Sequence, residues 1–127
     1  MNKKVILSFL LVLIISVTSV LSASAATVGF NLTKDYFSTS TAKISVGSTK
    51  KLDVKIFMSG NNDKNISYTI FTGNHNEYTS GTVNTSTRFL ETTLTNIPAG
   101  DYYMTVYCGA KNSQTVNCSA NGGLGNY

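Results

Sequence analysis

The chain has 127 residues, of which ten are lysine or arginine and six are aspartate or glutamate, and its formal net charge is +4. Two of the lysines lie at the N-terminal end. Without them the net charge falls to +2, from charges scattered along the sequence. Nucleic-acid binding needs a concentrated basic patch, which this distribution does not provide. We therefore expect no nucleic-acid partner.

The first 26 residues have the layout of a secretory signal peptide. Two lysines precede an apolar run over residues 5–20, and either Ala23-Ser24-Ala25 or Ser24-Ala25-Ala26 matches the small-residue site that signal peptidase cleaves. A membrane anchor is the alternative, but the apolar run is just shorter than the roughly 18 to 20 residues that a spanning helix needs. The sequence thus predicts a signal helix over 1–26 and export of a chain that is not stably inserted in a membrane.

Apolar and polar residues alternate with a period of two along the rest of the chain, a pattern typical of half-buried strands, and helical spacing is nearly absent. The clearest stretch places Leu52, Val54, Ile56 and Met58 on one side and Phe57 on the other. In the first half of the chain the pattern predicts strands over residues 28–33, 42–46, 51–58 and 66–71.

The same pattern continues in the second half of the chain. Gly81 interrupts one stretch and indicates an edge strand or a bulge there. Another stretch places Met104 and Val106 on one side, with Tyr103 and Tyr107 on the other. The second half thus predicts strands over residues 77–83, 88–95, 102–108 and 115–119.

These stretches amount to seven or eight short strands separated by Gly, Asn, Asp, Ser or Pro. Strands at such regular spacing are typical of antiparallel sandwiches and barrels, and the crossover helices of an α/β fold have no candidate here. We therefore expect an all-β chain with a single antiparallel β-sandwich over residues 27–120. The glycine-rich residues 121–127 are predicted to form a flexible tail.

The two cysteines of the chain, Cys108 and Cys118, lie on either side of a turn-forming stretch between two predicted strands. An even pair in an exported chain tends to be oxidised, so we expect a disulfide between them. Closing a loop of about ten residues contributes roughly 2.5 to 3 kcal/mol in the chain-entropy description. The alternative of a redox or metal-binding thiol pair lacks a nearby histidine and the two-residue spacing of such motifs.

The segment LTNIPAGDYYMTVYC, residues 94–108, resembles the corner that leads into the penultimate strand of immunoglobulin-like and fibronectin type III-like sandwiches. The resemblance implies that Ile97, Pro98 and Gly100 form this corner. It also implies that the hydroxyl of either Tyr102 or Tyr103 forms a hydrogen bond to the backbone. The segment is also similar to the strand entry of bacterial pre-peptidase C-terminal domains, which are secreted accessory sandwiches. An Ig-like or jelly-roll-like sandwich is thereby implied, and no particular function.

No residue pattern in the chain predicts an enzyme. His75, the one histidine, falls in a turn without any nucleophile motif, so a solvated loop residue is expected. Asp53 and Glu91 fall on outward faces of predicted strands, where pairing with nearby cations is expected rather than the opposed carboxylates of a glycosidase. We therefore expect no catalytic activity and no cofactor.

The stretch NNDKN places oxygen-bearing side chains at every second position, as calcium loops do. It lacks the glycine at the sixth place and the acid near the twelfth that such loops carry. An Asn/Asp-rich turn without a cation is therefore expected at Asn61, Asp63 and Asn65.

Five aromatic side chains are predicted on the outer faces of the strands. Rings exposed on a rigid sheet can stack on sugar faces or pack against a protein, since they offer apolar area at little entropic cost. The alternative is that the tail or a neighbouring loop covers them. The candidate ligand-binding residues are Tyr103, Tyr107, Phe57, Phe71 and Phe89.

Together these features predict a secreted, non-catalytic β-sandwich that binds an extracellular glycan or protein surface. The alternative is a secreted toxin or bacteriocin-like effector, a class with which the size, the export signal, the mild basicity and the disulfide are all compatible.

Overall fold

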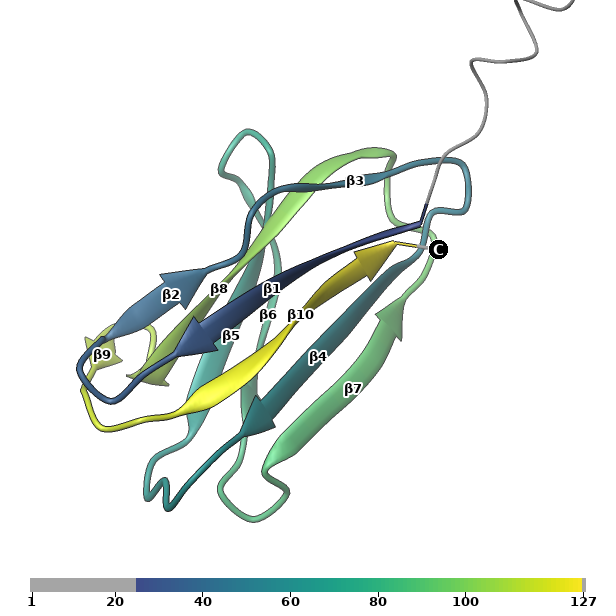
Figure 1. Ribbon diagram of the computed structural model, residues 1–127. Coiled ribbons are helices and arrows are strands. Elements are labelled where there is room, and N and C mark those ends of the chain that lie inside the picture. Colours follow the sequence, from purple (N-terminus) through teal and green to yellow (C-terminus); the bar gives the residue numbers. More distant parts are fainter. Residues whose placement is uncertain (1–24, 127) are drawn as a thin grey trace, which may run out of the picture.

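The computed structural model describes residues 25–126 and shows an all-β, antiparallel fold (Figure 1). Ten strands and no helix form within this range. The strands build two sheets that pack face to face as a sandwich, so the predicted fold class is confirmed. The predicted signal peptide lies outside the described residues, except for Ala25 and Ala26.

The first sheet, called sheet A, contains four strands. Neighbouring strands pair in an antiparallel manner throughout, and the register is unbroken across the sheet. Their spatial order is β1 (Ala26–Leu32), β10 (Ala120–Asn126), β4 (Leu52–Met58) and β7 (Phe89–Leu94).

The second sheet, called sheet B, is built around the long strand β8 (Gly100–Ala110). One side of β8 pairs with β5 (Ile66–Thr72), which pairs in turn with the edge strand β6 (Glu77–Val83). Along its other side and at its end, β8 pairs with three short strands, β2 (Ser38–Ser40), β3 (Ile44–Val46) and β9 (Ser113–Gln114).

The core lies between the sheets and follows the alternation of the sequence. In β4 the side chains of Leu52, Val54 and Ile56 are fully buried. In β8 the inward set comprises Tyr102, Met104, Val106 and Cys108, all of them buried. Burying such aliphatic and aromatic side chains, at about 1.5 to 3 kcal/mol each, supplies the main force that holds the sheets together.

The prediction of a flexible tail at the glycine-rich end of the chain is wrong. Residues 120–126 form the strand β10, which lies between β1 and β4. Two of its glycines are required because neighbouring backbones approach closely: a Cβ at Gly122 would overlap the carbonyl oxygen of Lys55, and one at Gly123 would overlap that of Val28. Because glycine has no side chain, the alternation that reveals a strand is not visible here. The sandwich therefore extends to residue 126.

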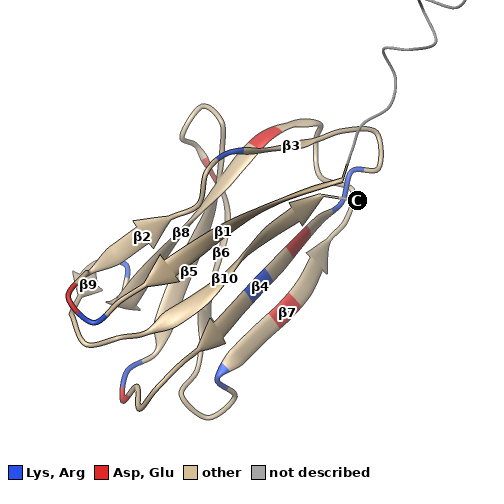
Figure 2. Cartoon of the chain, viewed as in Figure 1, with Lys and Arg blue, Asp and Glu red and all other residues tan. Residues whose placement is uncertain are grey.

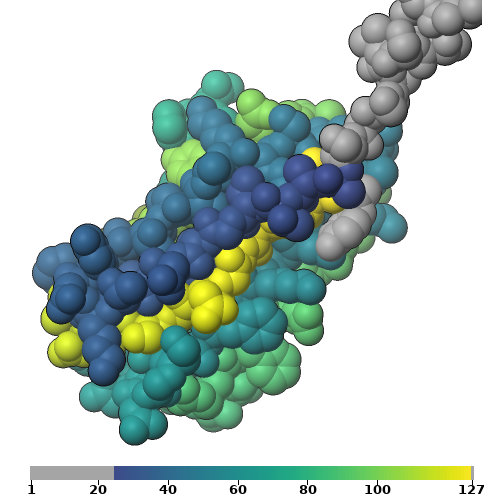
Figure 3. Space-filling model, in the orientation of Figure 1, coloured from purple at the N-terminus to yellow at the C-terminus, as the bar shows by residue number. Residues whose placement is uncertain are grey.

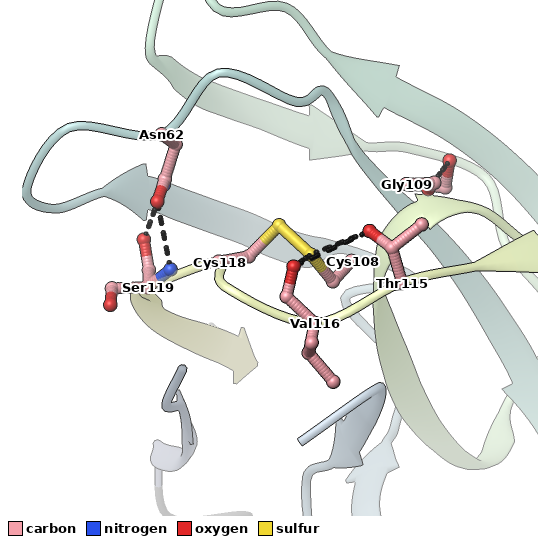
Figure 4. Close-up of a disulfide and its surroundings, with 8 residues drawn as sticks. Asn62, Cys108, Gly109, Thr115, Val116, Cys118 and Ser119 are labelled. Carbon is pink, nitrogen blue, oxygen red and sulfur yellow. Dashed lines mark hydrogen bonds between the residues drawn. A yellow bond between two sulfur atoms is a disulfide. The ribbon is translucent and has the colours of Figure 1, made fainter. Parts of the chain in front are cut away.

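The predicted disulfide between Cys108 and Cys118 is present, with a Cα–Cα distance of 5.5 Å (Figure 4). Both cysteines are fully buried. Beside the bridge, Asn62 donates from Nδ2 to the carbonyl oxygen of Ser119 at 2.7 Å, and the Ser119 amide donates to Asn62 Oδ1 at 3.0 Å. The end of β8, the start of β10 and the β4–β5 loop are thereby joined.

Candidate ligand-binding face

The five aromatic residues predicted as a binding set are divided between the two outer faces of the sandwich. Phe57 and Phe89 lie on the outer face of sheet A, opposite one another in the β4–β7 register. Phe71, Tyr103 and Tyr107 lie on the outer face of sheet B, in β5 and β8. The five rings therefore do not form a single site.

On sheet B the aromatic side chains are already in contact with one another and with polar neighbours. Phe71 and Tyr103 stack with their ring centroids 5.1 Å apart, and the Tyr103 hydroxyl lies 2.8 Å from Nδ1 of His75. The ammonium group of Lys111 lies 5.6 Å from the Phe71 centroid and 2.9 Å from Glu77 Oε2. This face offers little free aromatic surface.

Tyr107 is 7% exposed, which corrects its interpretation as an exposed contact residue. Lys111 follows β8 and belongs to the β8–β9 turn, yet its ammonium reaches back to Phe71 and Glu77. The Lys111 side chain therefore crosses this face of the sheet, and its stem covers apolar surface in the way typical of long cationic side chains.

The ion pair between Glu77 and Lys111 shifts the pKa of both side chains. The hydrogen bond from Lys111, and to a lesser extent that from Ser80, lowers the pKa of Glu77. The same bond to Glu77 raises the pKa of Lys111. Since both groups are solvent-exposed, the pair contributes little to stability.

The outer face of sheet A carries its largest exposed rings in one row across the four strands. The β-sheet register aligns Asn31, Asn121, Phe57 and Phe89 in that order, and directly paired residues share a face of the sheet. Phe57 is 39% exposed and Phe89 is 56% exposed. Two carboxamides and two aromatic rings thus lie side by side, and sequence alternation alone could not bring them together.

A second row of the same face is formed by Gly29, Gly123, Lys55 and Glu91. Lys55 Nζ and Glu91 Oε1 are 3.3 Å apart, and the charged positions are visible midway along β4 and the edge strand β7 (Figure 2). The glycines leave β1 and β10 without side chains in this row.

The third row is formed by Thr27, Gly125, Asp53 and Thr93. The Thr93 hydroxyl donates to Asp53 Oδ1 at 2.6 Å. The β10 residue of this row is again a glycine. Gly123 and Gly125, two residues apart on the same face of β10, therefore leave a continuous strip without side chains.

The glycines of these rows leave a trough of about 270 Å³ along β10 (Figure 3 views this face, with β1 purple and β10 yellow). Backbone atoms of β1 and β10 form its floor. One wall is built by Phe57, Lys55 and Asp53 of β4, and Thr27 and Asn121 complete the lining. We call this hollow the glycine trough. It is bordered by hydrogen-bonding groups and by one aromatic ring.

Other surface features lie elsewhere. A hollow near Tyr78, Pro98, Lys43 and Asp101 opens at the β5–β6 turn, and Tyr78 there is 40% exposed. Tyr36 and Phe37, in the loop after β1, are also exposed. Tyr36 and Phe37 belong to no alternating stretch, and the pattern around Tyr78 is weak, so the sequence does not single out these rings.

The residues considered for catalysis or cation binding are engaged in local contacts. Asp53 and Glu91 pair with Thr93 and Lys55, as described above. In the β4–β5 loop, Asn61, Asp63 and Asn65 are all exposed, and Asn65 Oδ1 accepts a hydrogen bond from the Thr85 amide at 3.1 Å.

Two further findings concern residues 25–126 as a whole. They contain no group of three or more His, Cys, Asp or Glu side chains placed to hold a metal ion. No helix in this range is long and apolar enough to cross a bilayer.

Comparison with known proteins adds no family to this picture. No protein-family model matches the chain, and no curated protein is significantly similar to it in sequence. The outer face of sheet A is therefore interpreted from its own geometry.

Proposed function

We propose that the protein is a secreted, non-catalytic β-sandwich that binds a glycan through the outer face of sheet A. The observation that carries the proposal is the row in which the exposed rings of Phe57 and Phe89 lie beside the carboxamides of Asn121 and Asn31. Aromatic faces stack on the apolar faces of sugar rings, and amide groups exchange hydrogen bonds with sugar hydroxyls. Both kinds of contact are available here within one row.

The proposal of secretion is supported by the N-terminal sequence and by the disulfide. A basic start, an apolar run and a small-residue cleavage site precede the sandwich. A buried disulfide is typical of proteins that fold in an oxidising compartment. A glycan outside the cell is therefore a ligand that the protein would meet.

The shape of the face favours a glycan over a folded protein as the ligand. A stable protein interface buries about 800 Å² on each partner and has an apolar core. On sheet A the two exposed rings lie at one end of a face whose remaining side chains are mainly charged, hydroxyl-bearing or absent. Such a surface suits a narrow, polar ligand with one apolar side.

Glycan-array binding by the exported chain, followed by calorimetry on the best ligand, tests the proposal. We expect Phe57→Ala and Phe89→Ala each to weaken binding by at least tenfold and to leave the unfolding temperature nearly unchanged, because both rings are exposed. Tyr78→Ala is the matched control, since Tyr78 is as exposed as Phe57 but lies in the other sheet. Its binding should equal that of the wild type.

Two outcomes would remove the proposal. One is the absence of binding to any glycan on the array. The other is glycan binding that survives both phenylalanine substitutions. Capture of a specific extracellular protein through Phe57 and Phe89 would instead assign the face to a protein partner.

A further inference from the structure

We infer that the ligand of this face is a neutral, linear glycan whose chain lies along β10 in the glycine trough and reaches beyond the Phe57–Phe89 pair. This inference rests on the proposed function. It adds the direction in which the ligand runs, the length of chain in contact and its charge.

The direction follows from where side chains are missing. In the second and third rows, Gly29, Gly123 and Gly125 of β1 and β10 carry no side chain, while Lys55 and Asp53 of β4 stand beside them. The trough therefore runs parallel to β10 and is walled along one side by β4. A linear ligand that stacks on Phe57 can continue along this path, whereas across the strands it would meet the side chains of Lys55 and Glu91.

The length follows from strand geometry. The wall runs from Phe57 to Asp53, a distance of four residues, or about 13 Å at the rise of a β-strand. A trisaccharide in extended form covers such a distance. Affinity is therefore expected to rise with chain length from a disaccharide upwards and to level off once the trough is filled.

The charge follows from the two charged side chains that line the trough, Lys55 and Asp53. Lys55 is paired with Glu91 at 3.3 Å, and Asp53 accepts the Thr93 hydroxyl at 2.6 Å. One ammonium and one carboxylate leave no net charge along the lining, and the ammonium is already paired with Glu91, which lies outside the lining. An anionic sugar would meet the carboxylate of Asp53 and an ammonium that already has an anionic partner, so a neutral sugar is favoured.

Gly29 allows the trough to be blocked without disturbing the fold. A Cβ added at Gly29 would meet only the carbonyl oxygen of Gly122, at 3.4 Å, which is an ordinary contact. Threonine suits an edge strand such as β1, and its side chain would project into the trough. Gly47→Thr is the matched control, because a Cβ at Gly47 meets nothing within 4 Å and Gly47 does not line the trough.

The experiment measures binding of wild-type, Gly29→Thr, Gly47→Thr and Phe57→Ala chains to neutral di- and hexasaccharides of cellulose, mannan and chitin, with hexagalacturonate as the charged probe. We expect a hexasaccharide of at least one neutral series to bind tenfold or more tightly than its disaccharide. Gly29→Thr should remove that gain, and Gly47→Thr should keep it. Unfolding curves confirm that both glycine variants are folded.

Each contrary outcome points to a different part of the account. Hexasaccharide binding that is lost in Phe57→Ala but unchanged in Gly29→Thr would overturn the trough and leave the proposed function standing. Tighter binding of hexagalacturonate than of every neutral hexasaccharide would overturn the assignment of charge. Absence of binding to all of these sugars and to the glycan array would overturn the proposed function, and this inference with it.

Discussion

The hydroxyl of Tyr102 donates a hydrogen bond to the carbonyl oxygen of Pro98, four residues earlier, at 2.6 Å. The Tyr102 ring is 2% exposed and meets the ring of Tyr78 edge to face, with centroids 5.7 Å apart. Burial, and to a lesser extent Tyr78, raises the pKa of Tyr102, so the hydroxyl stays protonated and keeps donating well into alkaline solution. The bond fixes the corner at which the chain enters β8, the strand at the centre of sheet B.

The first prediction concerns this corner. Tyr102→Phe keeps the buried ring and removes only the bond to Pro98, so we expect a loss of about 1 kcal/mol in the free energy of unfolding, measured in urea. Tyr103→Phe is the matched control, because its hydroxyl bonds to His75 at an exposed position. Equal stability losses in the two variants would contradict a special role for the corner.

The second prediction concerns the disulfide. Replacing both Cys108 and Cys118 by alanine opens a loop of ten residues and should cost about 2.7 kcal/mol through the entropy of the unfolded chain alone. Both sites are fully buried, so the small cavities left behind add to the loss. Denaturant unfolding of the double variant and of the reduced wild type measures the effect, and a stability equal to that of the oxidised protein would refute it.

The third prediction concerns how alanine substitution of different glycines near the trough affects stability. Gly122→Ala and Gly123→Ala place a methyl group onto the backbone of a neighbouring strand, so we expect each to destabilise the fold by more than about 3 kcal/mol or to prevent folding. Gly29→Ala has room and should change stability by less than about 0.5 kcal/mol. Circular dichroism with thermal unfolding distinguishes the two groups. Similar behaviour of all three variants would show that β10 is not held between β1 and β4 as described.

The fourth prediction concerns pH. Because Lys111 lowers the pKa of Glu77, the pair stabilises the folded state above the ordinary glutamate pKa of 4.5, and that contribution is lost as the pH falls through the lowered pKa. Lys111→Met should therefore raise the pKa of Glu77 toward its ordinary value, while the bond from Ser80 keeps it slightly below. An NMR titration of the Glu77 side chain measures the change, and an unaltered pKa in the variant would contradict the pairing.

The strands that alternate clearly were predictable because one of their faces is buried. In β4 and β8 the inward residues named from the sequence are all buried, and the pairing of Cys108 with Cys118 followed from the turn between them. The strand β10 was missed because three of its seven residues are glycine and two are asparagine, and Leu124 is its single large apolar residue, so no alternation is visible. Its position in the sheet depends on close backbone approach, which leaves no periodic signal.

The candidate site was only partly predictable for a related reason. Alternation placed Phe57 and Phe89 on outer faces, but it cannot tell which sheet a strand joins. The row from Asn31 to Phe89 exists only because β10 pairs with both β1 and β4. The burial of Tyr107, an outward residue of β8, is likewise not revealed by any local pattern.

The most direct test of the account is an NMR titration of the ¹⁵N-labelled exported chain with the tightest-binding hexasaccharide. We predict chemical-shift changes in the backbone amides of Asn31, Phe57, Phe89 and Asn121, in the side-chain amides of the two asparagines, and in the glycine amides of β10. Shifts concentrated around Phe71 and Tyr103 on sheet B, or no shifts under saturating sugar, would contradict the claim that the outer face of sheet A binds glycans.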